Sequence, residues 1–375
     1  MIGKPEGSLA SQRPAITSRL VKPTLLAIAL LAACGTEYMP IPAPQAVPLT
    51  YQFGPFPLAP HEELADLCVA VTLHNDDPIF VNAAAIEGAL GIHHSNWFWV
   101  PDNTAFAFPE GTFKCSDGGG IGHAFDQSAA ALFGGVLAAQ STQATKELQA
   151  FPPGSAIRIA PRSRIIATVH LLNAGDNPAT VPLSLTLTPL READVVTLLA
   201  GFSAEDMSLA LPAGKESRFT VECDMATEWD TLYRTGQVTS PHIDFKIYHA
   251  LAHYHAMGTA LTFEAIRDDG TVDTVWSTKN VIGDELGGML DPPFDMTGHS
   301  KVRLTCEYYN PDARTVRWGN GDGEMCIAFV FTDSTRVWTA GVVSEGTPGP
   351  SVVDSSGVVT FTEPACTVLA VDGQH

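Results

Sequence analysis

The sequence has few basic residues and little charge of either sign. Lys and Arg total 21 against 41 for Asp and Glu, which gives a formal net charge of −20. A surface this acidic repels phosphate backbones, so we expect no nucleic-acid partner. Only 17% of the residues are charged and 45% are hydrophobic. This composition argues against a disordered chain and predicts a globular protein with large cores.

The N-terminal region lacks a hydrophobic run long enough to cross a bilayer as a helix. The apolar run at residues 25–33 has nine residues, follows a positively charged stretch and ends in Leu31-Ala32-Ala33-Cys34. This pattern resembles a bacterial lipobox, in which the cysteine is lipidated and becomes the first residue of the mature protein. We therefore expect a signal peptide at residues 1–33 and a lipid anchor at Cys34. The protein would be exported and held on a bacterial membrane, in the periplasm or at the cell surface. The alternative is a plain secretory signal with a chance cysteine.

The rest of the chain is long enough for two domains. Prolines recur between residues 40 and 48, which predicts a semi-extended tether at residues 34–55. A length of 375 residues favours two domains. The polar segment near residues 189–195 lies between two strand-rich halves. We therefore expect domains at residues 56–192 and 193–372.

The periodicity of the sequence is that of strands. Leu183, Leu185 and Leu187 alternate with polar residues, and similar signals occur at residues 301–305 and 165–172. The high content of glycine and proline, 32 and 27 residues, indicates many turns. These signals predict an all-β protein built from sandwiches of antiparallel sheet. The alanine-rich stretch at residues 127–139 is compatible with a helix or with a buried strand.

Cysteines occur in a number that fits an exported protein. With Cys34 assigned to the lipid anchor, six of the seven remain: Cys68, Cys115, Cys223, Cys306, Cys326 and Cys366. An oxidising compartment makes three disulfides the natural expectation. Six cysteines allow 15 pairings, and the residues alone do not choose between them.

Two pairs of histidines are candidate metal ligands. Residues i and i+2 of a strand share a face, so His253 and His255 would project side by side. Adjacent His93 and His94 would point to opposite faces of a regular strand. They could bind one ion only at a bulge or a strand end. Taken alone, each pair is more often structural or on the surface.

Two further residues complete the candidate set. His170 lies in an apolar strand, where a core histidine is the usual interpretation. Met325 precedes a cysteine and by itself would be a core residue. A thioether added to imidazoles favours copper over zinc, because soft ligands suit Cu(I). His249 lies four residues before His253 and is a possible hydrogen-bond donor to a ligand, but we expect it at the surface.

The order and spacing of these residues resemble a known family. The sequence is similar to the copper type II ascorbate-dependent monooxygenases, the family of peptidylglycine alpha-hydroxylating monooxygenase and dopamine beta-hydroxylase. The resemblance covers roughly residues 60–335. Four family motifs appear in order: Gly91-Ile92-His93-His94-Ser95, Ala167-Thr168-Val169-His170, Ala252-His253-Tyr254-His255-Ala256-Met257-Gly258 and Asp322-Gly323-Glu324-Met325-Cys326.

The resemblance implies a cofactor set and a reaction. Two jelly-roll-like sandwich domains would face a cleft, with one copper in each. The first copper would be held by His93, His94 and His170 and would store and deliver an electron. The second, held by His253, His255 and Met325, would be the catalytic site for dioxygen and a small-molecule substrate. Ascorbate would supply two electrons, one oxygen atom would enter a substrate C–H bond, and the other would leave as water. The family's disulfides imply the pairs Cys68–Cys115 and Cys306–Cys326, which leaves Cys223–Cys366.

The sequence departs from the peptidylglycine branch at the substrate. An Arg, an Asn and a Tyr that bind a substrate carboxylate there are replaced by Leu251, Ile327 and Phe329. Peptide amidation precursors are therefore not the expected substrates, and the pocket should be more apolar. Two other functions are compatible with the residues: a non-enzymatic copper-binding or copper-handling lipoprotein on the same fold, and a zinc hydrolase that would leave Met325 and the His93–His94 pair unexplained.

Overall fold

The computed structural model describes residues 46–375 apart from 118–123, 280–281, 320, 363–364 and 374–375. The expected signal peptide and Cys34 lie outside the described residues. Residues 45–375 form one compact unit. Among the described residues, no helix is both long and apolar enough to cross a membrane.

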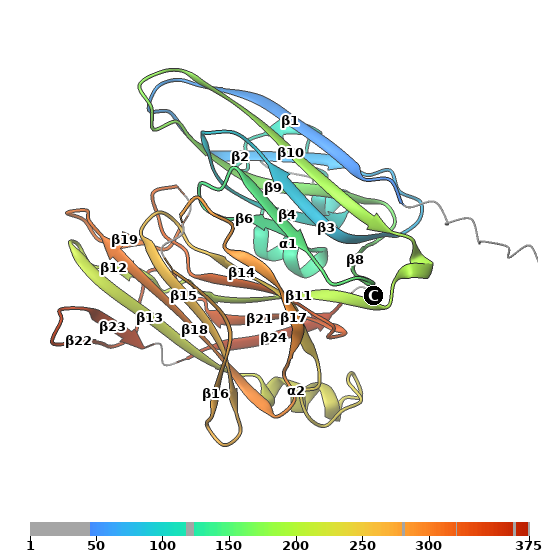
Figure 1. The fold of residues 1–375 in the computed structure, drawn as a ribbon, viewed down its shortest axis with the longest axis vertical. Helices are drawn as coiled ribbons and strands as arrows, with labels where there is room; N and C mark the ends of the chain where they lie inside the picture. The colour runs from blue at the N-terminus through green and yellow to red at the C-terminus, as the bar shows by residue number, and fades with distance from the viewer. Residues whose placement is uncertain (1–45, 118–123, 280–281, 320, 363–364, 374–375) are drawn as a thin grey trace, which may run out of the picture. The chain divides into compact units, whose positions relative to one another are not determined.

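A large mixed sheet runs through both halves of the sequence (Figure 1). In the described part of the chain it has eleven strands, and its main path is β1 (Leu49–Leu58), β10 (Ala179–Leu190), β3 (Ile79–Glu87), β8 (Ser155–Ile159), β11 (Thr197–Asp206), β20 (Ile327–Thr332), β14 (Lys246–His253) and β17 (Gly287–Asp295). Three strands pair beside this path: β7 (Lys146–Ala150) on β3, β21 (Arg336–Val342) on β11, and β24 (Thr367–Asp372) on β21.

A second sheet covers the first half of the large one. Its order is β5 (Gly111–Phe113), β2 (Glu63–Thr72), β9 (Ser163–Leu172), β4 (Ile92–Pro101) and β6 (Gly135–Gln140). A buried apolar core lies between them and takes residues from both sheets, including Leu183, Leu185 and Leu187 of β10 and Trp97 of β4. The alternation in the sequence therefore identified the buried face of β10 correctly.

A third sheet covers the second half of the large sheet. Its order is β16 (Val272–Lys279), β15 (Gly258–Arg267), β18 (His299–Asn310), β13 (Lys215–Asp224), β23 (Val359–Thr362) and β22 (Ser351–Val353). The core between these layers includes Phe219, Phe263, Tyr308 and Trp338. The short strands β12 (Ala210–Leu211) and β19 (Val316–Arg317) pair with each other. The helical segments are η1 (Thr104–Phe106), α1 (Gln127–Phe133), η2 (Glu192–Asp194) and α2 (Ala226–Arg234).

The protein is thus mostly β, as predicted, and most strand pairs are antiparallel. Three pairs are parallel, namely β8–β11, β11–β21 and β13–β23. The alanine-rich stretch that the sequence left undecided is both helix and strand, because α1 ends at Phe133 and β6 begins at Gly135. The polar segment expected at the domain boundary contains η2, and β8 pairs with β11 across it. The expected tether overlaps β1, which begins at Leu49.

The predicted cysteine pairs are all present. Within the described residues the disulfides are Cys68–Cys115, Cys223–Cys366 and Cys306–Cys326. Such bonds persist in oxidising compartments, so they suggest an extracytoplasmic protein.

Candidate metal centre

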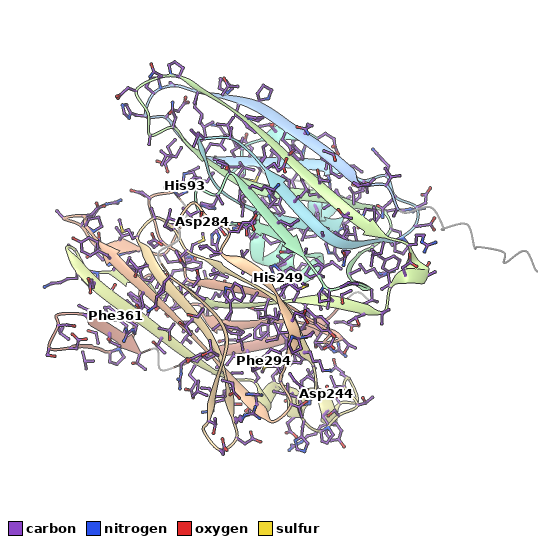
Figure 2. The ribbon with its side chains drawn as sticks, viewed as in Figure 1. His93, Asp244, His249, Asp284, Phe294 and Phe361 are labelled. Atoms are coloured by element: carbon purple, nitrogen blue, oxygen red, sulfur yellow. A yellow bond between two sulfur atoms is a disulfide. The ribbon has the colours of Figure 1, made fainter. Side chains whose placement is uncertain are left out.

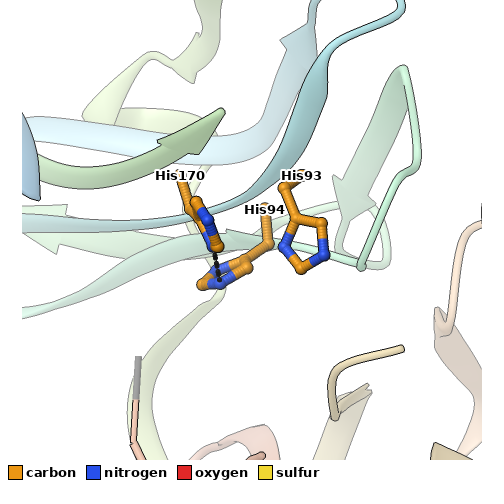
Figure 3. A group of neighbouring side chains, drawn as sticks. All are labelled: His93, His94 and His170. Carbon is orange, nitrogen blue, oxygen red and sulfur yellow. Dashed lines mark hydrogen bonds between the residues drawn. The ribbon is translucent and has the colours of Figure 1, made fainter. Parts of the chain in front are cut away.

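The first histidine group is formed where β4 pairs with β9. The pairing joins Ile92 to Leu171 and His94 to His170, so His93 is an extra residue in β4 at that point. This is the bulge that the sequence required for an adjacent pair, and it brings both imidazoles toward His170. The ring centroids of His93 and His170 lie 4.4 Å apart, and those of His94 and His170 lie 5.1 Å apart. Figure 3 shows the three rings gathered at one end of the sheet.

The second group lies where β14 ends. His253 is the last residue of the strand, and His255 follows it in the connection to β15. The expectation that both lie within a strand is therefore wrong for His255. The two rings nevertheless remain neighbours, with centroids 5.5 Å apart. Tyr254 between them turns into the core, and a Cβ at Gly258 would come within 2.1 Å of its ring, so this position requires glycine.

The two groups are in contact and share a residue. Among the described residues, His93, His94 and His170 form one candidate metal group, and His94, His253 and His255 form another. The ligand atoms within each group all lie within 4.8 Å of one another. The rings of His94 and His255 stack with centroids 4.4 Å apart. The sequence suggested two separate sites, whereas the structure shows one continuous cluster of five buried imidazoles.

The ring nitrogens of the cluster are suited to binding metal ions rather than protons. Burial, with a smaller contribution from neighbouring histidines, lowers the pKa of His93 and of His253 to about 3 and the pKa of His255 to about 4. The pKa of His94 is also lowered well below its usual value, chiefly by burial. The rings are therefore neutral, which is the form that binds metals. Several of their buried nitrogens have no hydrogen-bond partner among the described residues: Nδ1 of His93, Nδ1 of His94, both ring nitrogens of His253 and Nε2 of His255.

Glu63 orients the third histidine of the first group. Its Oε1 lies 2.8 Å from Nε2 of His170, while Nδ1 of His170 faces Nε2 of His94 at 3.2 Å. A carboxylate behind an imidazole fixes its tautomer and makes the other nitrogen a better ligand. Burial lowers the pKa of His170, and the bond to Glu63 acts in the opposite direction. Sequence patterns do not indicate this role, because Glu63 and His170 come from strands that are 107 residues apart in the chain.

Glu324 links the segment of Met325 to the second group. The carboxyl group of this fully buried residue accepts hydrogen bonds from the backbone N–H groups of His255 at 2.9 Å and of Met257 at 2.7 Å. Burial raises its pKa to about 8. The ring of His255 also hydrogen-bonds to the carbonyl of Gly323 through Nδ1. Met325 follows Glu324 in the chain and is itself buried, in a cluster with Leu251, Ile327 and Phe329.

A short loop between β6 and β7 connects both histidine segments. The N–H of Gln143 donates to the carbonyl of His93, and the hydroxyl of Thr142 donates to the carbonyl of Tyr254, each at 2.5 Å. Ser141 accepts a hydrogen bond from the N–H of Leu286 at 2.9 Å. We call residues 141–143 the clamp loop. It is bonded to the residue that begins the first group and to the residue between the two histidines of the second.

His249 does not lie at the surface as the sequence suggested. Its side chain is buried against Phe151 and Phe331, and the pKa of the ring is lowered to about 4 by that burial (Figure 2). Both ring nitrogens lack partners among the described residues. His249 is not part of either histidine group found within those residues.

Comparisons with known proteins add no functional information. No family model and no curated protein matches the chain. Among solved structures, the major capsid protein P2 from bacteriophage PM2 is similar at 9% identity over 76% of this chain and 97% of that chain, with a TM-score of 0.26. The PBSX exported protein XepA is similar at 9% identity over 76% of this chain and 86% of that chain, with a TM-score of 0.17. Likenesses at these TM-scores carry no argument about this protein.

Proposed function

We propose that this chain is a copper-dependent monooxygenase that hydroxylates a C–H bond of a small substrate with dioxygen and an ascorbate-type reductant. The supporting observation is the meeting of five buried, neutral histidines, two from each of two chain segments and one from β9, of which all but His170 have a ring nitrogen without a partner among the described residues. A cluster of uncharged imidazoles with no acidic ligand fits copper, which can change charge by one unit without a proton. The fold we propose is two jelly-roll-like sandwiches whose metal groups face each other.

The ligand assignment follows the two groups. His93, His94 and His170 would hold one copper, and His253 and His255, with the thioether of Met325, would hold the other. When bound, copper would supply one-electron transfer and the activation of dioxygen for attack on a C–H bond. The chain's own residues bury the imidazoles, keep them unprotonated, and hold His170 and His255 through Glu63 and Gly323. The burial also excludes water, which protects reactive species from side reactions.

The N-terminal sequence supports a location for the protein. We propose that Cys34 carries the lipid anchor and that the catalytic domain reaches its substrate outside the cytoplasm. Replacement of Cys34 by Ser should release the protein from membranes. A Ser variant that stays membrane-bound would contradict the anchor without affecting the assignment of the metal centre.

The decisive experiment measures copper content and oxygen uptake with ascorbate across a panel of small apolar and aromatic compounds. The Met325→Ile variant keeps the side-chain volume and removes the only soft donor proposed. It should keep a copper at the His93 group, lose the sulfur signature in X-ray absorption of the reduced protein, and lose substrate-dependent oxygen uptake. Met289→Ile is the matched control, because Met289 is 46% exposed on β17.

The same experiment separates the enzyme from a copper-handling protein. If the wild type binds copper but consumes no oxygen with any reductant, the non-enzymatic function replaces the enzyme. If Met325→Ile leaves both the sulfur signature and oxygen uptake unchanged, Met325 is a core residue and the second ligand set is misassigned.

A further inference from the structure

A cavity of about 210 Å³ lies next to Met325. It is on the face of the large sheet that points away from the core between the large sheet and the third sheet. One wall is formed by alternate residues of β11, Gly201, Ser203 and Glu205, whose neighbours Phe202 and Ala204 face the core. Residues from the first half of the chain also line the cavity, among them Asn96, Gln127 and Val136. The apolar lining includes Phe98, Val136, Trp318, Met325, Ile327 and Phe329. The volume fits a compact molecule, since pockets for drug-sized ligands are larger, roughly 300–1,000 Å³.

The polar side chains that line the cavity are those of Asn96, Gln127, Ser203, Glu205 and Thr339. Asn96 is 3% exposed, and its amide Nδ2 donates to Oε1 of Gln127 at 3.1 Å. Its Oδ1 is buried and has no partner within the described residues. Glu205 adds a carboxyl group on the β11 wall, and its pKa is raised by burial. The Asn96 oxygen is too buried to reach a ligand, whereas no hydrogen bond to the carboxyl group of Glu205 is found among the described residues, so a ligand that donates to Glu205 gains free energy.

Charge in the cavity excludes one class of ligand. Among the described lining residues there is no lysine and no arginine, and the one ionisable acid is Glu205. A carboxylate would lose its hydration on entry, would meet no cation in return and would lie near the carboxyl group of Glu205. Ile327 and Phe329 line the cavity at the positions where the peptidylglycine branch has an Asn and a Tyr that bind a substrate carboxylate, so this part of the lining is apolar.

We propose that this cavity is the substrate site and that it selects a compact, mostly apolar molecule that donates a hydrogen bond and carries no carboxylate, with Glu205 as the specificity-determining residue. The assignment as a substrate site rests on the proposed monooxygenase function. The proposed selectivity of binding does not rest on that function, because the cavity is formed by protein atoms alone.

Binding is therefore measured first on the metal-free protein with its disulfides intact. The probes share one carbon skeleton: toluene, benzyl alcohol, benzylamine and benzoate. Titration calorimetry should rank benzyl alcohol and benzylamine above toluene by roughly threefold to tenfold, the factor that one net hydrogen bond supplies. Benzoate should not bind detectably. Benzoate binding as tightly as benzyl alcohol, or equal affinity for all four probes, would overturn the proposal.

Three variants locate the binding. Glu205→Ala should reduce the preference of benzylamine over toluene, and Glu205→Gln, which keeps the side-chain volume, should do so less. Glu192→Ala is the control, because Glu192 is an exposed residue of η2 outside the cavity. Gly201→Val should block every probe, since a Cβ there meets only Val136, at 3.8 Å, and the added methyl groups enter the cavity. Unchanged binding in folded Gly201→Val would place the ligand elsewhere and refute the site.

The copper-loaded protein then distinguishes the two proposals. If the donor-bearing probes bind as ranked but no oxygen is consumed, the monooxygenase function fails and the selective cavity stands. If oxygen uptake depends on substrates that do not bind here, or on carboxylates, the enzyme stands and this assignment of the cavity is wrong.

Discussion

The clamp loop offers a sharp test of how the two histidine groups are held together. Thr142→Val replaces the hydroxyl by a methyl group of similar size, so the shape of the buried side chain is kept. The change removes the donor to the carbonyl of Tyr254, the residue between His253 and His255. No other hydrogen bond to this carbonyl is found among the described residues, so a buried acceptor is left without a partner. Such a loss costs about 1–3 kcal/mol.

The free energy of unfolding of the metal-free protein, measured by denaturant titration and tryptophan fluorescence, should fall by that amount. Copper affinity at the second group should fall as well, by at most the same free energy, because the His-x-His turn loses its anchor. Thr145→Val is the matched control, since Thr145 is an exposed residue of the same connection between β6 and β7. It should change stability by less than about 0.5 kcal/mol. The reasoning fails if the two variants are equally stable, or if Thr142→Val loses stability without any change in copper affinity.

Three further predictions test the surroundings of the centre. Glu63→Gln should weaken copper binding at the His93–His94–His170 group by about 10- to 100-fold and leave the His253–His255 group nearly unchanged, as measured by chelator competition; equal losses at both would contradict a local role. Because His94 lies in both groups, His94→Ala should lower copper binding at both, whereas His170→Ala should lower copper binding only at the group of His93 and His94. Copper stoichiometry measures this. Full retention of copper at either group in His94→Ala would show that His94 is not shared. Glu147 accepts a hydrogen bond from the N–H of Ser141 in the clamp loop, and burial raises its pKa from 4.5 to about 7. Between these pH values the folded state holds a proton that the unfolded state releases. The free energy of unfolding therefore falls by up to about 3 kcal/mol as the pH rises across that window. Glu147→Gln should therefore gain stability over the wild type at pH 8 relative to pH 5, and an equal difference at the two pH values would refute the assignment.

Local patterns in the sequence were sufficient for much of the architecture. The alternation at Leu183, Leu185 and Leu187 identified a strand and its buried face, because side chains on successive strand residues point to opposite sides. The adjacent histidines required an irregularity, and β4 has its bulge at that place. The family resemblance implied two cysteine pairs and left Cys223–Cys366 as the third, and each is present.

Contacts between distant segments could not be predicted in this way. Glu63 and His170 are 107 residues apart, Thr142 and Tyr254 are 112 apart, and Glu324 reaches His255 across 69 residues. Each of these residues is an ordinary polar side chain in its local sequence. His249 was assigned to the surface because a lone histidine carries no periodic signal strong enough to show that its strand is covered on both faces.

The contact between the groups changes how the centre should be understood. With separate ligand shells, each metal site would depend only on its own half of the chain. Here His94 belongs to both groups, and its ring stacks on that of His255. The clamp loop adds backbone hydrogen bonds to both segments, and β8 pairs with β11 to join the halves in one sheet. The distance between the groups is therefore set by packing across the whole molecule. If His94 also contributes to the ion at His253 and His255, a motion that separates the halves would divide the ligands of that ion, and metal binding and the association of the halves would stabilise each other.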